Sequence, residues 1–240
     1  MKAFKDWLVE KNVNEAQLGV VDKEININHV IYGNPAQEDF EIAQNPDDEI
    51  KNWFIKEGLV EKIRSEAPLN DSEITKEDLK KLVNLTSNAT AEEITFARYV
   101  EDLSNFAQSF IDILKENGHE ISMGDYFGID SQTESVMHFL KDVINRPRPY
   151  QLARYYNVPL YPIIKTDAMS ASYPSGHALS AFVMSSYYAK KYPEIANVLK
   201  EHGEKIAKSR EITGIHYPSD TEISKKIADI IIENNLIKDR

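Results

Sequence analysis

The chain has 240 residues, of which 42% are hydrophobic and 28% are charged, and its net charge is -11 at pH 7. A chain of this size and composition can bury the core of one domain, or of one domain with an appendage. The negative charge argues against broad binding to nucleic acid or to an anionic membrane, because both require concentrated Lys and Arg. The absence of cysteine excludes disulfides, thiolate metal sites and thiol nucleophiles.

No apolar stretch approaches the roughly 18 residues that a membrane-spanning helix needs. The nearest candidate, residues 179–189, is interrupted by serines and tyrosines. The first ten residues also lack the apolar core of a secretory signal. We therefore expect a soluble protein without membrane insertion, which is either cytoplasmic or has already lost a signal, so that its location is unknown. The sequence leaves open whether the chain forms a homo-oligomer.

Residues 1–85 are predicted to form short helices and loops, because breakers such as Asn34-Pro35 and Asn45-Pro46 interrupt them. Acidic runs in this part favour a solvated surface. A pattern resembling a capping box at Thr75–Asp78 predicts a helix over 76–86. No motif assigns a role to residues 1–85, and we expect them to pack on a catalytic domain spanning 86–240.

The remaining chain has a predominantly helical pattern. A complete capping box at Thr90–Glu93, followed by an amphipathic apolar stripe, predicts one long helix that ends at Asn117-Gly118. Further helices are predicted over 131–145, 175–191, 193–210 and 219–234, with a loop rich in Tyr and Pro over 150–173. Because alternating strand patterns are scarce, the predicted fold class is all-α.

The first chemically informative segment contains Lys141 and Arg148, which flank the end of the helix predicted over 131–145. Pro147 disfavours helical geometry at Arg146 and so ends that helix. Lys141 in its last turns and Arg148 in the following loop can therefore point toward one place. Arg suits bidentate contact with phosphate oxygens and Lys supplies a point charge, although each residue taken alone is more often an ordinary surface cation.

The second segment is Pro174-Ser-Gly-His177 at the start of a predicted helix. Ser175 is a natural N-cap, and Gly176 lets a ligand approach the main chain where the first helical amides are unpaired. Such a helix start can bind an anion. His177 beside a bound phosphate could protonate a leaving alkoxide, although a plain Pro-Ser helix start with an incidental histidine is the ordinary alternative.

The third segment places Arg210 six residues before His216, and Asp220 four residues after that histidine. A carboxylate that accepts a hydrogen bond from one imidazole nitrogen leaves the other nitrogen unprotonated and oriented, which suits a nucleophile. The ordinary alternative is a loop in which Asp220 caps a helix.

The three segments together resemble a known signature. Lys-x6-Arg-Pro, Pro-Ser-Gly-His and Ser-Arg-x5-His-x3-Asp, in this order, are similar to the motifs of the type 2 phosphatidic acid phosphatase superfamily. That group includes the soluble bacterial class A nonspecific acid phosphatases and the vanadium-dependent haloperoxidases. The resemblance covers about residues 130–235 and implies a compact helical bundle of the acid phosphatase/vanadium haloperoxidase type.

The resemblance also implies roles for individual residues. Lys141, Arg148 and Arg210 would bind the phosphate oxygens, with hydrogen bonds from Ser175 and the Gly176 amide. His177 would be the general acid, His216 the nucleophile that forms a phosphohistidine, and Asp220 its orienting partner. No metal or other cofactor is expected, and vanadate should act as an inhibitor that mimics phosphate. The other histidines, His29, His119, His138 and His202, match no motif and are interpreted as surface or core residues.

The predicted function is therefore hydrolysis of a small, soluble phosphomonoester. A vanadium-dependent haloperoxidase is the main alternative, because vanadate would occupy the same pocket. Haloperoxidases have a large insertion between the last two motifs, whereas only 32 residues separate His177 from Arg210 here, so the phosphatase is favoured. A noncatalytic structural or interaction protein that retains the fold is a third possibility, which the intact His216 and Asp220 disfavour. The sequence does not identify the physiological substrate.

Overall fold

The computed structural model describes residues 26–34, 36–46, 48–165 and 169–238. Within these ranges all regular secondary structure is helical, which confirms the all-α prediction. The first helices are α2 (Gln37–Ala43), α3 (Glu49–Lys56), α4 (Leu59–Glu66), α5 (Glu73–Ser87), α6 (Ala91–Tyr99) and α7 (Leu103–Glu116). They are followed by α8 (Met123–Asp130), α9 (Glu134–Ile144), α10 (Pro149–Ala153), α11 (Gly176–Lys191), α12 (Ala196–Ile212) and α13 (Pro218–Glu233). None of these helices is both long enough and apolar enough to cross a bilayer.

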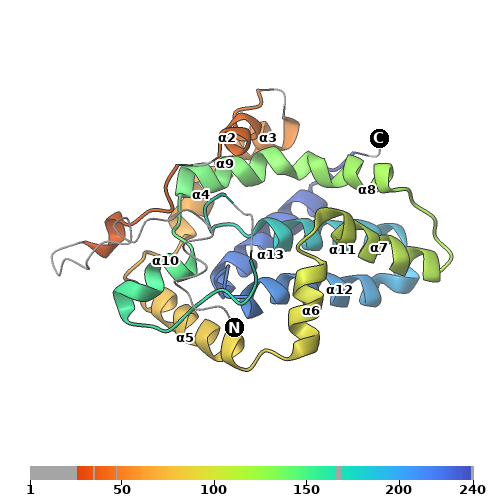
Figure 1. Cartoon of the computed structure of the whole chain (residues 1–240). Helices are drawn as coiled ribbons and strands as arrows, with labels where there is room; N and C mark the ends of the chain where they lie inside the picture. The colour runs from red at the N-terminus through yellow and green to blue at the C-terminus, as the bar shows by residue number, and fades with distance from the viewer. Residues whose placement is uncertain (1–25, 35, 47, 166–168, 239–240) are drawn as a thin grey trace.

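Helix α11 is the centre of the bundle, where it packs along both α12 and α13. Helix α9 runs across the bundle, and α2 and α3 lie on its outer side (Figure 1). Helices α5 and α6 contact α12. The residues of the three motifs lie at the end of α9, the beginning of α11, the end of α12 and the beginning of α13, and in the segments next to these helix ends.

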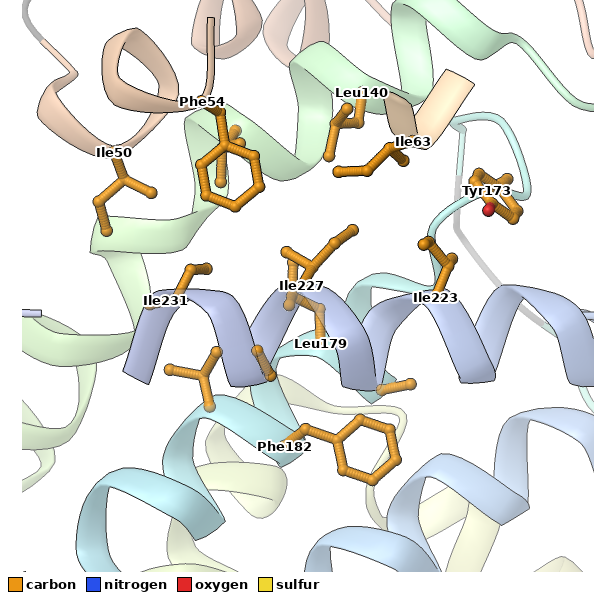
Figure 2. Packing of buried hydrophobic residues seen from close by; sticks show 14 of the residues in the cluster. Ile50, Phe54, Ile63, Leu140, Tyr173, Leu179, Phe182, Ile223, Ile227 and Ile231 are labelled. Atoms are coloured by element: carbon orange, nitrogen blue, oxygen red, sulfur yellow. The ribbon is translucent and has the colours of Figure 1, made fainter. Parts of the chain in front are cut away.

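The main hydrophobic cluster joins the first part of the chain to the second. Phe54 from α3, Leu140 from α9, Leu179 from α11 and Ile227 from α13 belong to this cluster (Figure 2). All four side chains are at most 1% exposed. Residues before position 85 therefore contribute to the same core as the motif-bearing helices, and α5 itself runs across position 85.

A second cluster fills the space between α7, α8, α11 and α12. It encloses His202, whose Nε2 lies 2.7 Å from Ser109 Oγ and whose ring meets the ring of Phe110 edge-on at 4.7 Å. Burial is the main cause that lowers the pKa of His202 to about 4. A neutral imidazole in an apolar environment fits its interpretation as a core residue.

The prediction of one helix over 91–117 is wrong in one respect, because the structure has two helices in this range. α6 ends at Tyr99 and α7 begins at Leu103, and the Asp102 side chain accepts a hydrogen bond from Asn105 N at 2.9 Å as the N-cap of α7. The predicted capping box at Thr90 and Glu93 is present. The apolar residues keep helical spacing through the break, so periodicity alone does not reveal it. Asp102, a residue type typical of an N-cap, was the sequence signal for a second helix start.

Two smaller boundaries also differ from prediction. The N-cap of α5 is Ser72, whose hydroxyl accepts from Thr75 N at 3.2 Å, so Thr75 lies inside the helix and does not start it. The segment predicted as a loop over 150–173 begins with helix α10, which has Pro149 at its first position. Proline is favoured there because that position needs no amide hydrogen.

Gly203 allows the close packing of α12 on α11. A Cβ atom at this position would lie 2.6 Å from Ser185 Oγ and 3.0 Å from the backbone oxygen of Ala181. We expect Gly203→Ala to lower the free energy of unfolding by about 1–3 kcal/mol, because overpacking outweighs the gain of about 1 kcal/mol in helix propensity. Urea unfolding measures this. Gly128→Ala is the matched control, since a Cβ there meets nothing within 4 Å, and equal effects of the two changes would contradict the packing argument.

Candidate active site

The predicted phosphate-binding residues meet in one pocket of about 450 Å³. Its lining includes Lys141 from α9, Arg148 just before α10, and Arg210 from α12. Each of these three cations is at most 4% exposed. Gly176, His177 and His216 complete the same wall. The remaining predicted residues, Ser175 and Asp220, are buried next to this wall in the chain and in space.

Local backbone geometry explains how the first motif reaches the pocket. Helix α9 ends where Asn145 takes a left-handed conformation with φ 50°. The chain then turns back along the bundle, so Lys141 and Arg148 approach the pocket from two directions. The Lys141 ammonium donates to the carbonyl of Ala171. Burial, followed by the repulsion of Arg148, lowers the pKa of Lys141 well below its ordinary value.

The spacing of the third motif follows from the end of α12. Arg210 lies in the last turn, and Gly214 adopts the left-handed region with φ 74°, which a residue with a side chain would adopt only under strain. The reversed chain brings the amide of His216 within 3.3 Å of the carbonyl of Arg210. A glycine at this point therefore places the cation and the imidazole side by side.

His216 is held at both ring nitrogens. Its Nδ1 lies 3.2 Å from Asp220 Oδ2, and its Nε2 lies 3.0 Å from Arg148 Nη1. Because a guanidinium only donates, Nε2 must be the acceptor and the proton must be on Nδ1. Burial, together with the nearby cations, lowers the pKa of His216 well below its ordinary value. A neutral imidazole with an unprotonated Nε2 is the form that a nucleophile requires.

Asp220 is held by more partners than the sequence suggested. Its carboxylate accepts from Tyr217 N at 2.9 Å and from Ser172 Oγ at 2.5 Å, in addition to His216. It also forms a buried ion pair with Arg146, whose Nη1 lies 2.7 Å from Oδ1. These contacts fix the carboxylate that orients His216.

Arg146 is the main residue that the sequence analysis missed. Besides Asp220, it donates to Ser219 Oγ at 2.8 Å and to Thr75 Oγ1 at 3.1 Å, and its guanidinium lies 3.9 Å from the centre of the Tyr217 ring. It is 3% exposed. A second arginine within the first motif was the available signal, but its partners are 71 to 74 positions away in the chain, and spacing alone does not identify them.

Arg210 and Arg148 differ in the donors that they leave available. Arg148 donates from Nε and Nη2 to the carbonyl of Ser170 at 3.0 and 2.9 Å, and from Nη1 to Ile215 O at 3.1 Å. Arg210 forms an ion pair with Glu101 through Nη2, while its buried Nε and Nη1 have no partner. Unsatisfied buried donors of this kind are costly unless a ligand accepts from them.

The second motif also keeps polar atoms free. Ser175 is the N-cap residue of α11, as predicted, but its side chain makes no capping hydrogen bond, and its buried Oγ has no partner. Its amide donates to Ser224 Oγ at 3.0 Å, which positions the start of the helix. His177 Nε2 is likewise buried and unpartnered. Together with the two free donors of Arg210, these atoms form a site that can donate hydrogen bonds to an oxyanion.

The break between α6 and α7 positions His177. Hydrogen bonds with the backbone of Glu101 and Val100 act to raise the pKa of His177, but burial, as the largest cause, and the charge of Arg210 lower it well below its ordinary value. The ring also meets Phe106 edge-on at 5.7 Å. A continuous helix over 91–117 would keep the carbonyls of these residues in its own hydrogen bonds, so the interruption serves the site.

The other histidines fall in three places. His29 is exposed, and His119 lies on the surface 2.7 Å from Glu194. His138 differs from its interpretation as a surface or core residue, because it lines the pocket with Nδ1 3.2 Å from Asp39 Oδ1. Spacing could have indicated this, since His138 precedes Lys141 by three positions on one face of α9.

Anion binding should be accompanied by proton uptake at His177. The pKa of His177 is low, and a bound oxyanion would raise it. Anion binding should therefore tighten as the pH falls from the pKa of the complex toward the pKa of the free protein. Calorimetry with sulfate, in buffers of different ionisation enthalpy, measures the protons taken up. The His177→Asn variant is expected to lose this uptake, and an unchanged uptake in the variant would assign it to another group.

A comparison with known protein families identifies the part of the chain that carries the three motifs. The model of the PAP2 superfamily matches residues 131–228, which span all three motifs. This part of the chain therefore matches the PAP2 superfamily, which confirms the resemblance to the signature of that superfamily. No curated protein matches the sequence.

Two solved structures are similar to this chain, and the first of them supports the fold. The structure described as the first bacterial vanadium-dependent iodoperoxidase aligns with a TM-score of 0.52 and 18% identity, over 69% of this chain and 48% of that chain. This chain thus spans about half the length of that protein, and at such low identity the likeness concerns the fold alone. A transmembrane PAP2-type phosphatidylglycerolphosphate phosphatase from Bacillus subtilis aligns with a TM-score of 0.43 and 15% identity, over 78% of this chain and 96% of that chain.

Proposed function

We propose that the protein is a phosphomonoester hydrolase that works without a metal and through a phosphohistidine at His216. The observation that carries this proposal is the protonation geometry of His216. Asp220 accepts from Nδ1 and Arg148 donates to Nε2, so Nε2 is the unprotonated nitrogen, and it lies in the same pocket as the free donors of Arg210. Three buried cations supply the charge stabilisation that a metal provides in other phosphatases.

In the first step, His216 Nε2 attacks phosphorus while the bond to the leaving oxygen breaks. His177 donates its proton to that oxygen, and the alcohol departs. Asp220 stabilises the positive charge that develops on the imidazole as the N–P bond forms. Arg210, with its unpaired Nε and Nη1, is suited to bind the equatorial oxygens.

In the second step, a water molecule attacks the phosphohistidine. His177, now neutral, takes a proton from this water, the N–P bond breaks, and phosphate leaves with His216 neutral again. The same group acts first as acid and then as base, which requires a pKa that the bound phosphate brings toward the working pH. We expect activity from the acidic to the neutral range.

Hydrolysis of p-nitrophenyl phosphate in the presence of EDTA tests the proposal. We expect turnover that survives the chelator and is inhibited by vanadate and by inorganic phosphate. A strict requirement for Mg²⁺ would contradict the mechanism. Equal inactivity of the wild type and the His216→Ala variant over a wide pH range would remove the enzymatic assignment.

A vanadium-dependent peroxidase is the second candidate, because the iodoperoxidase structure shares the fold and vanadate fits the same donors. Against it, the chain between His177 and Arg210 holds only the rest of α11, a short turn and most of α12. The protein loaded with vanadate is tested with hydrogen peroxide and iodide or bromide. Halide oxidation at a rate comparable to phosphate ester hydrolysis would favour this alternative.

A further inference from the structure

The pocket has two ends of opposite charge. Lys141, Arg148 and Arg210 occupy one end, whereas carboxylates from α2, the break between α6 and α7, the end of α8 and the start of α9 also line the pocket. These carboxylates belong to Glu38, Asp39, Glu101, Asp130 and Glu134, of which Glu101 lies at the cationic end because it pairs with Arg210. The cations account for binding of the phosphoryl group, but they give no reason for an acidic lining around the group attached to it.

Asp130 at the end of α8 is the most informative of these carboxylates. It is 8% exposed, and its Oδ1 is buried without a hydrogen-bond partner. Its other polar contact is a hydrogen bond with Ser180, which lies one turn after His177 on α11. Burial raises the pKa of Asp130. An unpaired carboxyl oxygen in a pocket wall is costly, and a ligand that donates to it would remove the cost.

The neighbours of Asp130 add negative charge. Partial burial, followed by repulsion from Asp130 and Glu38, raises the pKa of Glu134. Among the residues that the structure describes, no Lys or Arg lies within ion-pair distance of Glu38, Asp130 or Glu134. Asp39 and Glu101, in contrast, lie against His138 and Arg210. Glu38, Asp130 and Glu134 therefore repel one another with no neighbouring Lys or Arg to offset the repulsion.

Two helices set the distance between the ends. On α9, Glu134 and Lys141 are seven positions apart, which is about 10 Å along the axis. On α11, Ser180 follows His177 by three positions, so Asp130 lies about one turn from the proposed acid. A ligand that joins a phosphoryl group to a cation through two or three carbon atoms spans this interval. Phe106 and Met137 provide apolar contacts between the ends.

We propose that the substrate is a zwitterionic phosphomonoester whose leaving group carries an ammonium, with Asp130, Glu134 and Glu38 binding that ammonium. This inference rests on the proposed phosphatase activity and names its substrate class. An organic cation fits better than a metal ion, because the described part of the chain holds no group of three or more His, Asp or Glu side chains arranged to coordinate one. A primary ammonium can instead donate to separated carboxylates, and a quaternary ammonium, which has no N–H, is attracted to them by charge alone.

The test compares esters that differ only in charge. Phosphocholine is paired with 3,3-dimethylbutyl phosphate, its neutral isostere, and phosphoethanolamine with propyl phosphate. We expect kcat/KM to favour the charged member of at least one pair by about tenfold or more, since one desolvated charge contact is worth this much. The preference should persist in EDTA. The inference would be overturned if the ratio of kcat/KM for the charged ester to kcat/KM for the neutral ester were at or below one in both pairs.

Variants of the pocket carboxylates test which residues cause the preference for the charged ester. Asp130→Asn and Glu134→Gln should each reduce the ratio of charged to neutral ester toward one, and the neutral ester is the internal reference in each variant. Glu134 is exposed, so its variant stays informative if Asp130→Asn fails to fold. Glu116→Gln removes the same charge from an exposed site outside the pocket and should keep the wild-type ratio. A ratio unchanged in both pocket variants would contradict the assignment.

The inference and the proposed activity can fail separately. Hydrolysis of p-nitrophenyl phosphate without any preference for the ammonium esters would remove the inference alone. If the protein shows no turnover, the preference is measured as binding. Calorimetry then gives the affinities of the His216→Ala variant for phosphocholine and for its neutral isostere, and their ratio replaces the ratio of kcat/KM values. A stronger preference for glycerol 3-phosphate than for either ammonium ester would assign the carboxylates to hydroxyl groups and overturn the inference.

Discussion

The His216→Ala variant is expected to hydrolyse p-nitrophenyl phosphate at least about 10⁴-fold more slowly than the wild type, because loss of a nucleophile removes the covalent route entirely. The reason lies in the geometry of the ring, whose Nε2 has no proton and whose Nδ1 is held by Asp220. The measurement is kcat in the presence of EDTA. Circular dichroism and urea unfolding check that the variant is folded.

The matched control is His119→Ala, which removes a histidine from the surface, where it contacts Glu194 and Tyr192. Its kcat should stay within about twofold of the wild type, because surface changes away from a site have small effects. A His216→Ala variant that retains more than a tenth of the wild-type rate would mean that water attacks phosphorus directly, with the histidine in an assisting role.

Removal of Arg146 should have the second large effect, on stability and activity together. Arg146→Ala leaves the carboxylate of Asp220 buried without its ion-pair partner, at 0% exposure. Breaking a buried pair from one side costs about 3–5 kcal/mol. We expect a loss of this size in the free energy of unfolding, measured with urea, and a fall in kcat because Asp220 no longer holds His216 in place.

A double-mutant cycle separates these two effects. Arg146→Met combined with Asp220→Asn removes both charges, so the double variant should be more stable than Arg146→Met alone. Its kcat should stay low, since the carboxylate that orients His216 is gone. Additive losses of stability in the two single variants would mean that Arg146 and Asp220 do not stabilise each other.

The sequence predicted most helices and the order of the motifs, because capping residues and apolar periodicity are local signals. α11 and α13 begin within a residue of their predicted starts. The break at Val100–Asp102 was missed because Val100, Leu103 and Phe106 keep the apolar spacing through it. Tertiary contact decides that boundary, since the backbone at the break binds His177.

The candidate site also has a part that local sequence patterns predict and a part that depends on tertiary contacts. Motif spacing placed Lys141, Arg148, His177, Arg210 and His216 correctly around one pocket. Arg146, Glu101 and the acidic lining depend on side chains that meet across long stretches of sequence, and no local pattern encodes those meetings. Glu38 and Asp39 illustrate this, because α2 contributes them through its packing on α9.

Trapping the covalent intermediate tests the central claim most directly. The protein is mixed with a rapidly hydrolysed aryl phosphate, quenched within milliseconds, digested at alkaline pH, where phosphohistidine survives, and analysed by mass spectrometry. We predict phosphate on His216, absent from the His216→Ala variant. Phosphate on Ser175 or another serine, or a burst of p-nitrophenol with no phosphorylated histidine, would contradict the mechanism.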